Sequence, residues 1–259
     1  MRHLISFTAI FLSGLLLLSG CGGNKADAAI VRKAIGGMLN KKPDELTTED
    51  YEKTTAFVLS ATKVSDLTPI KQLKNLQALY LMNARVSDFT ARVKGLTGLQ
   101  GLKLNWTSAD LTPIKELKNL RVLYLFNTKV TDLTPIKELS DLKWLNLSGT
   151  KISDLTPIKE LKGLQELDLS GTKVSDLSPI KDLINLYDLR LSDTKVSDPT
   201  PLKSLINLLM LDLAGTAVSD LSPLKELNKL QGLVLSRTKV SDEQVAELKK
   251  ALPKLTIRR

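Results

Sequence analysis

The sequence predicts an α/β solenoid, a stack of short similar units with a parallel sheet along one side. An eleven-residue phrase that begins at Lys129, KVTDLTPIKEL, returns in closely related form three more times at intervals of 22 residues. Leucines separated by one residue recur at the same interval, and such an alternation sends both leucines to one side of a strand. A unit this short covers its leucine face only by stacking on its neighbours. The most regular pairs are Leu145/Leu147, Leu167/Leu169, Leu189/Leu191, Leu211/Leu213 and Leu233/Leu235.

Each strand is followed by a turn and a short helical segment. A threonine stands three residues after the second leucine, as in Leu147 and Thr150. Its hydroxyl is expected to satisfy backbone groups of the turn, which would form a buried ladder of hydrogen bonds. A Thr-Pro or Ser-Pro step then predicts a short helical or 3₁₀ turn, with the hydroxyl as N-cap and proline at the first helical position.

Helices are expected to cover both ends of the stack, because an open solenoid exposes its apolar interior there. Residues 29–56 predict a helical N-terminal cap, with an amphipathic helix followed by a second helix that starts near Thr48. The repeats then run over 57–240. Residues 241–259 predict a C-terminal capping repeat, in which Asp242 caps a helix that Pro253 stops.

The repeated pattern L-x-x-L-x-L-x-x-T-x-V-x-D-L-x-P-I-x-x-L resembles the 22-residue leucine-rich repeats of internalins and related bacterial surface proteins. The resemblance covers about residues 57–259. It implies a right-handed superhelix with a parallel sheet on the concave side, short helical or 3₁₀ turns on the convex side, and a concave surface that binds proteins. This chain departs from the family in having threonine where asparagine is common.

The N-terminus predicts an export signal over residues 1–20. Its apolar run over 4–18 is too short to span a bilayer as a mature helix. The sequence Leu18-Ser19-Gly20-Cys21 resembles the lipobox of bacterial lipoproteins. This resemblance implies cleavage before Cys21, acylation of that residue and a lipidated tether over 21–28.

Acylation by two or more chains gives stable membrane anchoring. We therefore expect a protein of the bacterial cell envelope that is anchored by lipid on Cys21 and faces outside the cytoplasm. Gly22 is not the aspartate that retains lipoproteins in the inner membrane of Gram-negative bacteria, which favours the outer membrane in such a source.

The binding surface is expected on the concave side, where the residues flanking each leucine are displayed. Aromatic side chains gather in the N-terminal half and acidic ones, around an arginine, in the C-terminal half. Exposed aromatic residues on a rigid sheet often anchor interfaces, although they can also merely cover neighbouring strands. The candidate partner-binding residues are Tyr80, Trp106, Tyr124, Phe126, Trp144, Glu166, Asp168, Asp188, Arg190 and Asp212.

One unit, from Phe89 to Leu104, departs from the others. It has an extra residue before Leu104, lacks the Thr/Ser-Pro turn and lies beside Trp106. Irregular repeats can be binding specialisations, and sequence drift explains this irregularity in the segment 89–110 equally well.

Composition and motifs argue against catalysis. The single histidine, His3, leaves with the signal, and the single cysteine is expected to be acylated, so the usual nucleophilic triads and zinc sites are missing. Carboxylates at 168, 188 and 212 lie on an open sheet that would desolvate them little. We expect no enzyme, no cofactor and no metal.

The formal charge of +9 raises the question of nucleic acid. Export would separate the protein from cytoplasmic nucleic acid, and most lysines lie in the repeat beside acidic residues, so nucleic acid is not expected. The prediction is a protein partner. The alternatives are a glycan or an anionic envelope polymer, and an architectural spacer that binds nothing on its concave face.

Overall fold

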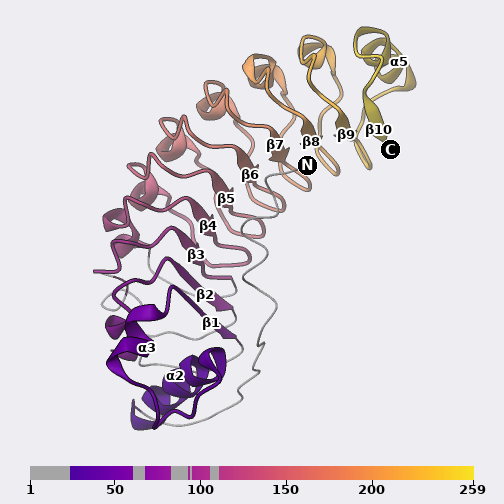
Figure 1. The fold of residues 1–259 in the computed structure, drawn as a ribbon. Helices are drawn as coiled ribbons and strands as arrows, with labels where there is room; N and C mark the ends of the chain where they lie inside the picture. The colour runs from indigo at the N-terminus through magenta and orange to yellow at the C-terminus, as the bar shows by residue number, and fades with distance from the viewer. Residues whose placement is uncertain (1–23, 61–67, 83–92, 94, 106–110) are drawn as a thin grey trace.

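The computed structural model describes residues 24–60, 68–82, 93, 95–105 and 111–259, which form a curved solenoid (Figure 1). Ten strands make one sheet in chain order, and every neighbouring pair is parallel. This confirms the predicted α/β solenoid. The strands are β1 Ala56–Ser60, β2 Ala78–Met82, β3 Gly101–Lys103, β4 Val122–Tyr124, β5 Trp144–Asn146, β6 Glu166–Asp168, β7 Asp188–Arg190, β8 Met210–Asp212, β9 Gly232–Val234 and β10 Thr256–Arg258.

Strand pairing keeps equivalent leucines next to one another. Leu123 pairs with Leu145, which pairs with Leu167. The irregular unit keeps this register as well, because Leu79 pairs with Leu102 and Leu102 with Leu123. The extra residue before Leu104 therefore does not shift the pairing of β3 with either neighbour.

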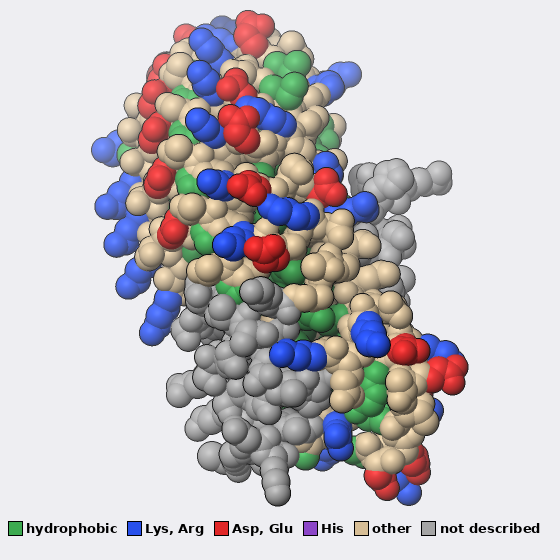
Figure 2. All heavy atoms as spheres, turned by 90° about the vertical axis from the view of Figure 1, so that its left-hand side faces the viewer, with side chains coloured by type: hydrophobic (Ala, Val, Ile, Leu, Met, Phe, Trp, Pro, Cys, Tyr) green, Lys and Arg blue, Asp and Glu red, His purple; other side chains and the backbone are tan. Residues whose placement is uncertain are grey.

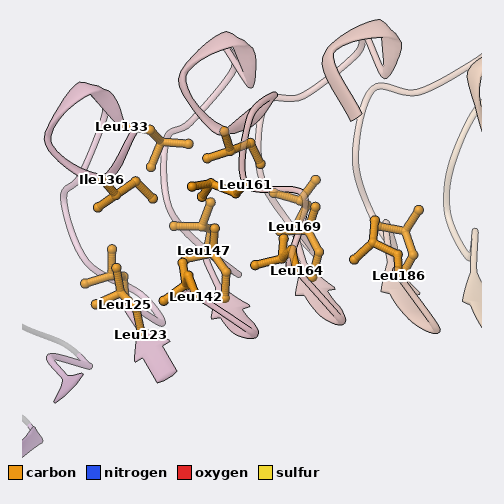
Figure 3. Packing of buried hydrophobic residues seen from close by; sticks show 14 of the residues in the cluster. Leu123, Leu125, Leu133, Ile136, Leu142, Leu147, Leu161, Leu164, Leu169 and Leu186 are labelled. Carbon is orange, nitrogen blue, oxygen red and sulfur yellow. The ribbon is translucent and has the colours of Figure 1, made fainter. Parts of the chain in front are cut away.

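The core is one continuous apolar stack between the sheet and the outer turns. Figure 3 shows leucines of successive repeats lying side by side between the strands and these turns. Leu123, Leu125 and Ile136 are fully buried, and the leucines at the equivalent strand positions are buried in each later repeat up to β9. Burying one such side chain stabilises the fold by roughly 2 kcal/mol, so the predicted stacking of leucine pairs supplies the main driving force.

Short 3₁₀ helices occupy the convex side, as expected from the Thr/Ser-Pro steps, and proline is the second residue of all seven in the described part of the chain. The N-cap prediction is wrong. In η3, the residue before the helix is Leu133 and its first residue, Thr134, donates its backbone N–H to Asp132 Oδ1 at 2.8 Å. The 3₁₀ helices are η1 Thr68–Gln72, η2 Thr112–Glu116, η3 Thr134–Ile136, η4 Thr156–Ile158, η5 Ser178–Ile180, η6 Thr200–Ser204 and η7 Ser222–Leu224.

The same aspartate cap recurs in the next four repeats. Aspartate accepts this bond better than threonine here because it stands two residues earlier, where its carboxylate reaches back over the turn. The pKa of each of these aspartates is lowered by the hydrogen bonds from the following Thr or Ser. The further caps are Asp154, Asp176, Asp198 and Asp220, each with an N–H···O distance of 2.8 or 2.9 Å.

The threonines after the strands are placed as predicted, but their hydroxyls bond within their own repeat and do not link repeats. Thr150 is buried, and its hydroxyl donates to the carbonyl of Leu147 at 2.6 Å. Thr128, Thr172, Thr194 and Thr216 make the same bond. Each bond therefore closes the turn of its own repeat, and the bonds form a row rather than a ladder that links repeats.

Asparagine side chains provide a link between repeats that the sequence reading missed. Asn119 Nδ2 donates to the carbonyl of Thr97 at 2.8 Å, and Asn207 Nδ2 donates to the carbonyl of Ile184 at 2.7 Å. Asn75 and Asn185 make the equivalent contacts. Three of these bonds join an outer turn to the preceding repeat, and the bond of Asn75 joins the first outer turn to α3.

Helices cover both ends of the stack (Figure 1). At the front, α2 spans Asn24–Leu39 and α3 spans Thr48–Lys53. The start of α2 differs from the prediction, since most of the expected tether over 21–28 is helical. The physical reason is the run of alanines from 26 to 29, interrupted only by Asp27, which contains no helix breaker. No helix in the described part of the chain is long and apolar enough to cross a membrane.

Charged contacts hold the two caps in place. Asp50 accepts from Lys41 Nζ at 2.7 Å and from the backbone N–H of Thr47 at 2.8 Å, which lower its pKa to about 2. At the rear, α5 spans Asp242–Ala251, and its N-cap is Ser241 rather than Asp242, because the serine hydroxyl accepts from Gln244 N. Asp242 pairs with Arg259 instead.

The outer side carries mixed charge. Figure 2 shows basic and acidic side chains interspersed there, with hydrophobic side chains scattered between them. Several form exposed pairs between neighbouring repeats, such as Lys118 with Glu138 at 2.8 Å. A mixed surface of this kind keeps the stack soluble and presents no uniform field to a partner.

Candidate functional site on the concave face

The concave face displays two rows of side chains, one on each side of the buried central leucines. The structure places both rows where the sequence predicts them, because every strand is in register with the next. The first row is Ala78, Gly101, Val122, Trp144, Glu166, Asp188, Met210 and Gly232. The second row is Tyr80, Lys103, Tyr124, Asn146, Asp168, Arg190, Asp212 and Val234.

The N-terminal part of the second row is closed by a stack of three side chains. Lys103 Nζ lies 4.6 Å from the ring centroid of Tyr80 and 4.6 Å from that of Tyr124. A cation at this distance from an aromatic face is attracted by the ring quadrupole. Burial lowers the pKa of Lys103 and raises those of Tyr80 and Tyr124. We call this group, Tyr80, Lys103 and Tyr124, the tyrosine–lysine stack.

Tyr80 is therefore not the exposed anchor that the sequence predicts. Only 7% of its surface is exposed. Its hydroxyl lies 3.4 Å from the place where a Cβ at Gly101 would stand, so the ring packs against the neighbouring strand. Of the two roles considered for aromatic residues, Tyr80 has the second, because it covers a neighbouring strand.

A hollow of about 220 Å³ follows directly after this stack. It lies over β4 to β7, where the aromatic half of the face meets the acidic half. Six of the ten predicted residues line it, together with a residue that the prediction left out, Asn146. The lining residues are Tyr124, Trp144, Leu145, Asn146, Glu166, Leu167, Asp168, Asp188 and Arg190.

Tyr187 supports the hollow from the side and was missed by the sequence reading. Its hydroxyl donates to Glu166 Oε1 at 2.5 Å, and Trp144 lies near enough to the same hydroxyl to influence its pKa. Burial and the neighbouring carboxylate raise the pKa of Tyr187 to about 12, so the hydroxyl stays protonated. The hydrogen bond orients Glu166, which pairs in register with Trp144 on the neighbouring strand.

The acidic side chains of the hollow are also held in place. Asp168 accepts from the backbone N–H of Ser170 at 3.0 Å and from Asn146 Nδ2 at 3.1 Å. Arg190 binds both oxygens of Asp188, at 3.2 and 2.9 Å. The nearby Asp188 is the main reason that the pKa of Arg190 is raised. The charges therefore have defined positions before any ligand arrives.

The remaining predicted residues lie elsewhere. Phe126 follows β4 and is half-buried, and its backbone N–H donates to Asn105 Oδ1 at 3.1 Å. Asp212 pairs in register with Arg190 but does not line the hollow, and one of its oxygens accepts from the N–H of Ala214. Trp106 and Cys21 lie outside the described residues. Met210, beside Asp212, is 45% exposed and was predicted only as part of the first row.

The hollow has the features of a recognition site. Among the described residues, no group of three or more His, Cys, Asp and Glu side chains is placed to hold a metal ion. The side chains offer two aromatic surfaces, three carboxylates and one guanidinium on a rigid sheet. Such an arrangement can hold a polar or cationic group by hydrogen bonds, charge and aromatic contact.

Comparisons with known proteins agree with this architecture. Residues 105–257 match a family of proteins described as a leucine-rich repeat region. No curated protein matches the chain by sequence.

Solved structures resemble the chain over most of its length. An internalin, inlF, from Listeria monocytogenes is 27% identical with a TM-score of 0.74, over 90% of this chain and 74% of that one. Internalin C2 from the same species is 32% identical with a TM-score of 0.75, over 80% of this chain and 92% of that one. A leucine-rich repeat protein from Leptospira interrogans is 29% identical with a TM-score of 0.73, over 83% of this chain and 57% of that one.

The family match extends over more than half of the chain, and it coincides with the stacked parallel strands that the structure shows. The chain therefore belongs to the leucine-rich repeat family, and its repeats are of the internalin-like kind.

Proposed function

We propose that this chain is a non-catalytic binding module that holds a protein partner on its concave face, and that it is anchored by lipid on Cys21 outside the cytoplasm. The observation that carries the binding proposal is the preformed hollow over β4 to β7, where Trp144 and Tyr124 border charged side chains of defined position. Aromatic residues in such surroundings are the usual anchors of protein interfaces.

The rigidity of the face supports a protein partner. Ten in-register strands hold the side chains without loops that must be ordered on binding, so little conformational entropy is lost. The face is also long, which suits an extended protein surface better than a small metabolite. A glycan is less favoured, because the ring of Tyr124 beside the hollow already faces Lys103 and leaves Trp144 as the main surface for a sugar ring.

The test of the binding proposal is site-specific photocrosslinking in cells that make the full chain. A photoreactive residue at Met210, on the concave face but outside the hollow, should crosslink to a defined protein. The same residue at Lys159, which is exposed on the outer turn, is the matched control and should not. Adding Trp144→Ala should reduce the crosslink at least tenfold, whereas Trp144→Phe should keep part of it.

Other outcomes would contradict a protein partner. Equal crosslinking from both positions would mean that the concave face is not selective. If Trp144→Ala abolishes retention on envelope polysaccharide and no protein is crosslinked, the partner is a glycan. If Trp144→Ala changes neither measurement, the solenoid serves as an architectural spacer.

The proposed anchor has a separate test, which rests on the lipobox-like sequence before Cys21. Cells fed radiolabelled palmitate should label the full chain and retain it in the membrane fraction, and Cys21→Ala should abolish both. A chain that stays unlabelled, or that remains in the membrane fraction after Cys21→Ala, would contradict lipid anchoring at this residue.

A further inference from the structure

The concave face already holds one cation between aromatic rings. Lys103 comes from β3, and the rings that flank it come from β2 and β4, each 4.6 Å away. Neighbouring strands thus place a ring, an ammonium group and a second ring in one row. This row of the sheet can therefore accommodate a cation beside an aromatic ring.

The hollow repeats half of this arrangement. In the second row, Tyr124 on β4 is followed by Asn146 on β5, at the place where a long basic side chain would complete the pattern. Asn146 is short and turned toward its own strand exit, because its Oδ1 accepts from the N–H of Ser148 at 3.0 Å and from the Ser148 hydroxyl at 2.6 Å. The space above it is bordered by Tyr124 and Trp144.

Charge distinguishes the hollow from the tyrosine–lysine stack. Three carboxylates and one guanidinium line the hollow, which gives a formal charge of −3 + 1 = −2. Arg190 makes its two side-chain hydrogen bonds to Asp188, and it interacts with Glu166 and Asp168 only through its charge. Glu166 accepts from Tyr187 through Oε1, and no hydrogen bond to Oε2 is found among the described residues. The hollow therefore favours a positive charge.

The size of the hollow limits its occupant. Sites for small-molecule ligands usually measure about 300–1,000 Å³, and a hollow of about 220 Å³ suits a single side chain better. A lysine or arginine can lay its apolar stem along an aromatic ring while its charged end reaches a carboxylate. Both surfaces are available here, from Trp144 and Glu166.

We propose that the hollow between Tyr124, Trp144 and Glu166 takes one basic side chain, a lysine or an arginine, from the bound protein. This inference rests on the proposed function, and it adds the chemistry of the contact. The basic side chain lies over Asn146, with its stem against Trp144 and its cation directed at Glu166 and Asp168. The partner is therefore a protein segment that presents a basic residue to the centre of the concave face.

The proposal is tested with a minimal probe, the peptide N-acetyl-Gly-Gly-Lys-Gly-Gly-amide, added to the ¹⁵N-labelled full chain. The indole N–H resonance of Trp144, assigned with Trp144→Phe, reports binding because Trp144 lines the hollow. We expect saturable shifts with a dissociation constant in the millimolar range that weakens as salt rises. The same peptide with norleucine in place of lysine should produce no saturable shift.

Two variants locate the cation. Glu166→Gln keeps an acceptor for Tyr187 while removing the charge, and it should weaken the lysine peptide about tenfold. Asp212→Asn is the matched control, since it removes one charge from the same face outside the hollow and should change binding less than twofold. Asn146→Lys would place an internal cation beside Tyr124 and should abolish binding.

The outcomes separate this inference from the proposed function. The proposal that the hollow takes a basic side chain would be wrong if the lysine and norleucine peptides bound equally. It would also be wrong if Glu166→Gln and Asp212→Asn weakened binding equally. If no peptide shifts Trp144 while the crosslinked protein is still lost in Trp144→Ala, the concave face binds a protein by other chemistry. If the crosslinked protein is also insensitive to Trp144→Ala, both proposals are wrong.

Discussion

Two neighbouring stretches of the concave face have the same backbone geometry, but the surface of one is closed and that of the other has a hollow. Over β2 to β4, Lys103 fills the space between Tyr80 and Tyr124 and closes the surface. Over β5 to β7, the short Asn146 leaves a hollow between Tyr124 and the charged residues beyond it. Aromatic residues occur in both stretches. The side chain in the register position between them decides whether a ring serves the fold or remains available to a partner.

The comparison first predicts what the two stretches share. Leu102 lies under the closed stretch and Leu167 under the hollow, and both are almost completely buried in the same leucine stack. Leu102→Ala and Leu167→Ala should each lower the free energy of unfolding by about 2–5 kcal/mol, because each leaves a cavity. Urea denaturation followed by circular dichroism measures both. A loss below about 1 kcal/mol at either site would mean that the stack is not continuous.

The next largest effect on stability is expected from Tyr187, which contacts only the stretch with the hollow. Tyr187→Phe removes the donor to Glu166 and should lower the free energy of unfolding by about 1.5 kcal/mol, the lower end for a hydrogen bond to a charged group. The indole resonance of Trp144 should move as well. Tyr51, which is buried in the N-terminal cap, offers a control, because Tyr51→Phe should leave that resonance in place. An unmoved Trp144 resonance in Tyr187→Phe would show that Tyr187 does not support the hollow.

The same hydroxyl predicts a pH dependence. The pKa of Tyr187 is raised to about 12 in the fold, so its stabilising bond is fully present below the ordinary tyrosine pKa and is lost as the pH rises through about 12. Absorbance at 295 nm should show a late tyrosine ionisation that is missing in Tyr187→Phe. A late step that survives the substitution must be assigned to another tyrosine.

A smaller effect is expected from opening the closed stretch. Lys103→Met removes the cation between Tyr80 and Tyr124 and should cost about 1 kcal/mol, whereas Lys103→Arg keeps a cation and should cost less. Thermal unfolding of the two variants makes the measurement. Equal losses would indicate that the packed stem of Lys103, and not its charge, closes the stretch.

The smallest effect is expected on the outer side. Lys118→Met breaks an exposed pair with Glu138 and should change the free energy of unfolding by less than about 0.5 kcal/mol, because water screens both groups. The lysine peptide should bind this variant as it binds the unchanged chain. A clear loss of binding would contradict the separation of the outer side from the hollow.

Repetition explains how much could be predicted from the sequence. The leucine pairs, the buried threonines and both concave rows follow from the 22-residue interval, since every repeat reports the same geometry. The aspartate caps carried a signal that was missed, because Asp132 and its four equivalents stand two residues before each Thr/Ser-Pro step. Six residues of the hollow were predicted for the same reason.

The contacts that failed prediction join residues about 22 positions apart. Tyr80 packs against Gly101 and Lys103 of the next strand, and Tyr187 holds one residue of the hollow because it reaches Glu166 of the preceding repeat. Tyr187 has one weak signal, an aromatic ring where other repeats have Lys143, Gln165 or Gln231. Nothing within either repeat reveals what its neighbour provides.

The sequence by itself determined the solenoid, its leucine core and the side chains that face inward, because these follow from periodicity within a single chain segment. Only the tertiary structure decided which inward side chains are closed off and which surround a hollow. The physical reason is that parallel strands stand about 4.8 Å apart, so each side chain is covered or left open by its partners on the two adjacent strands.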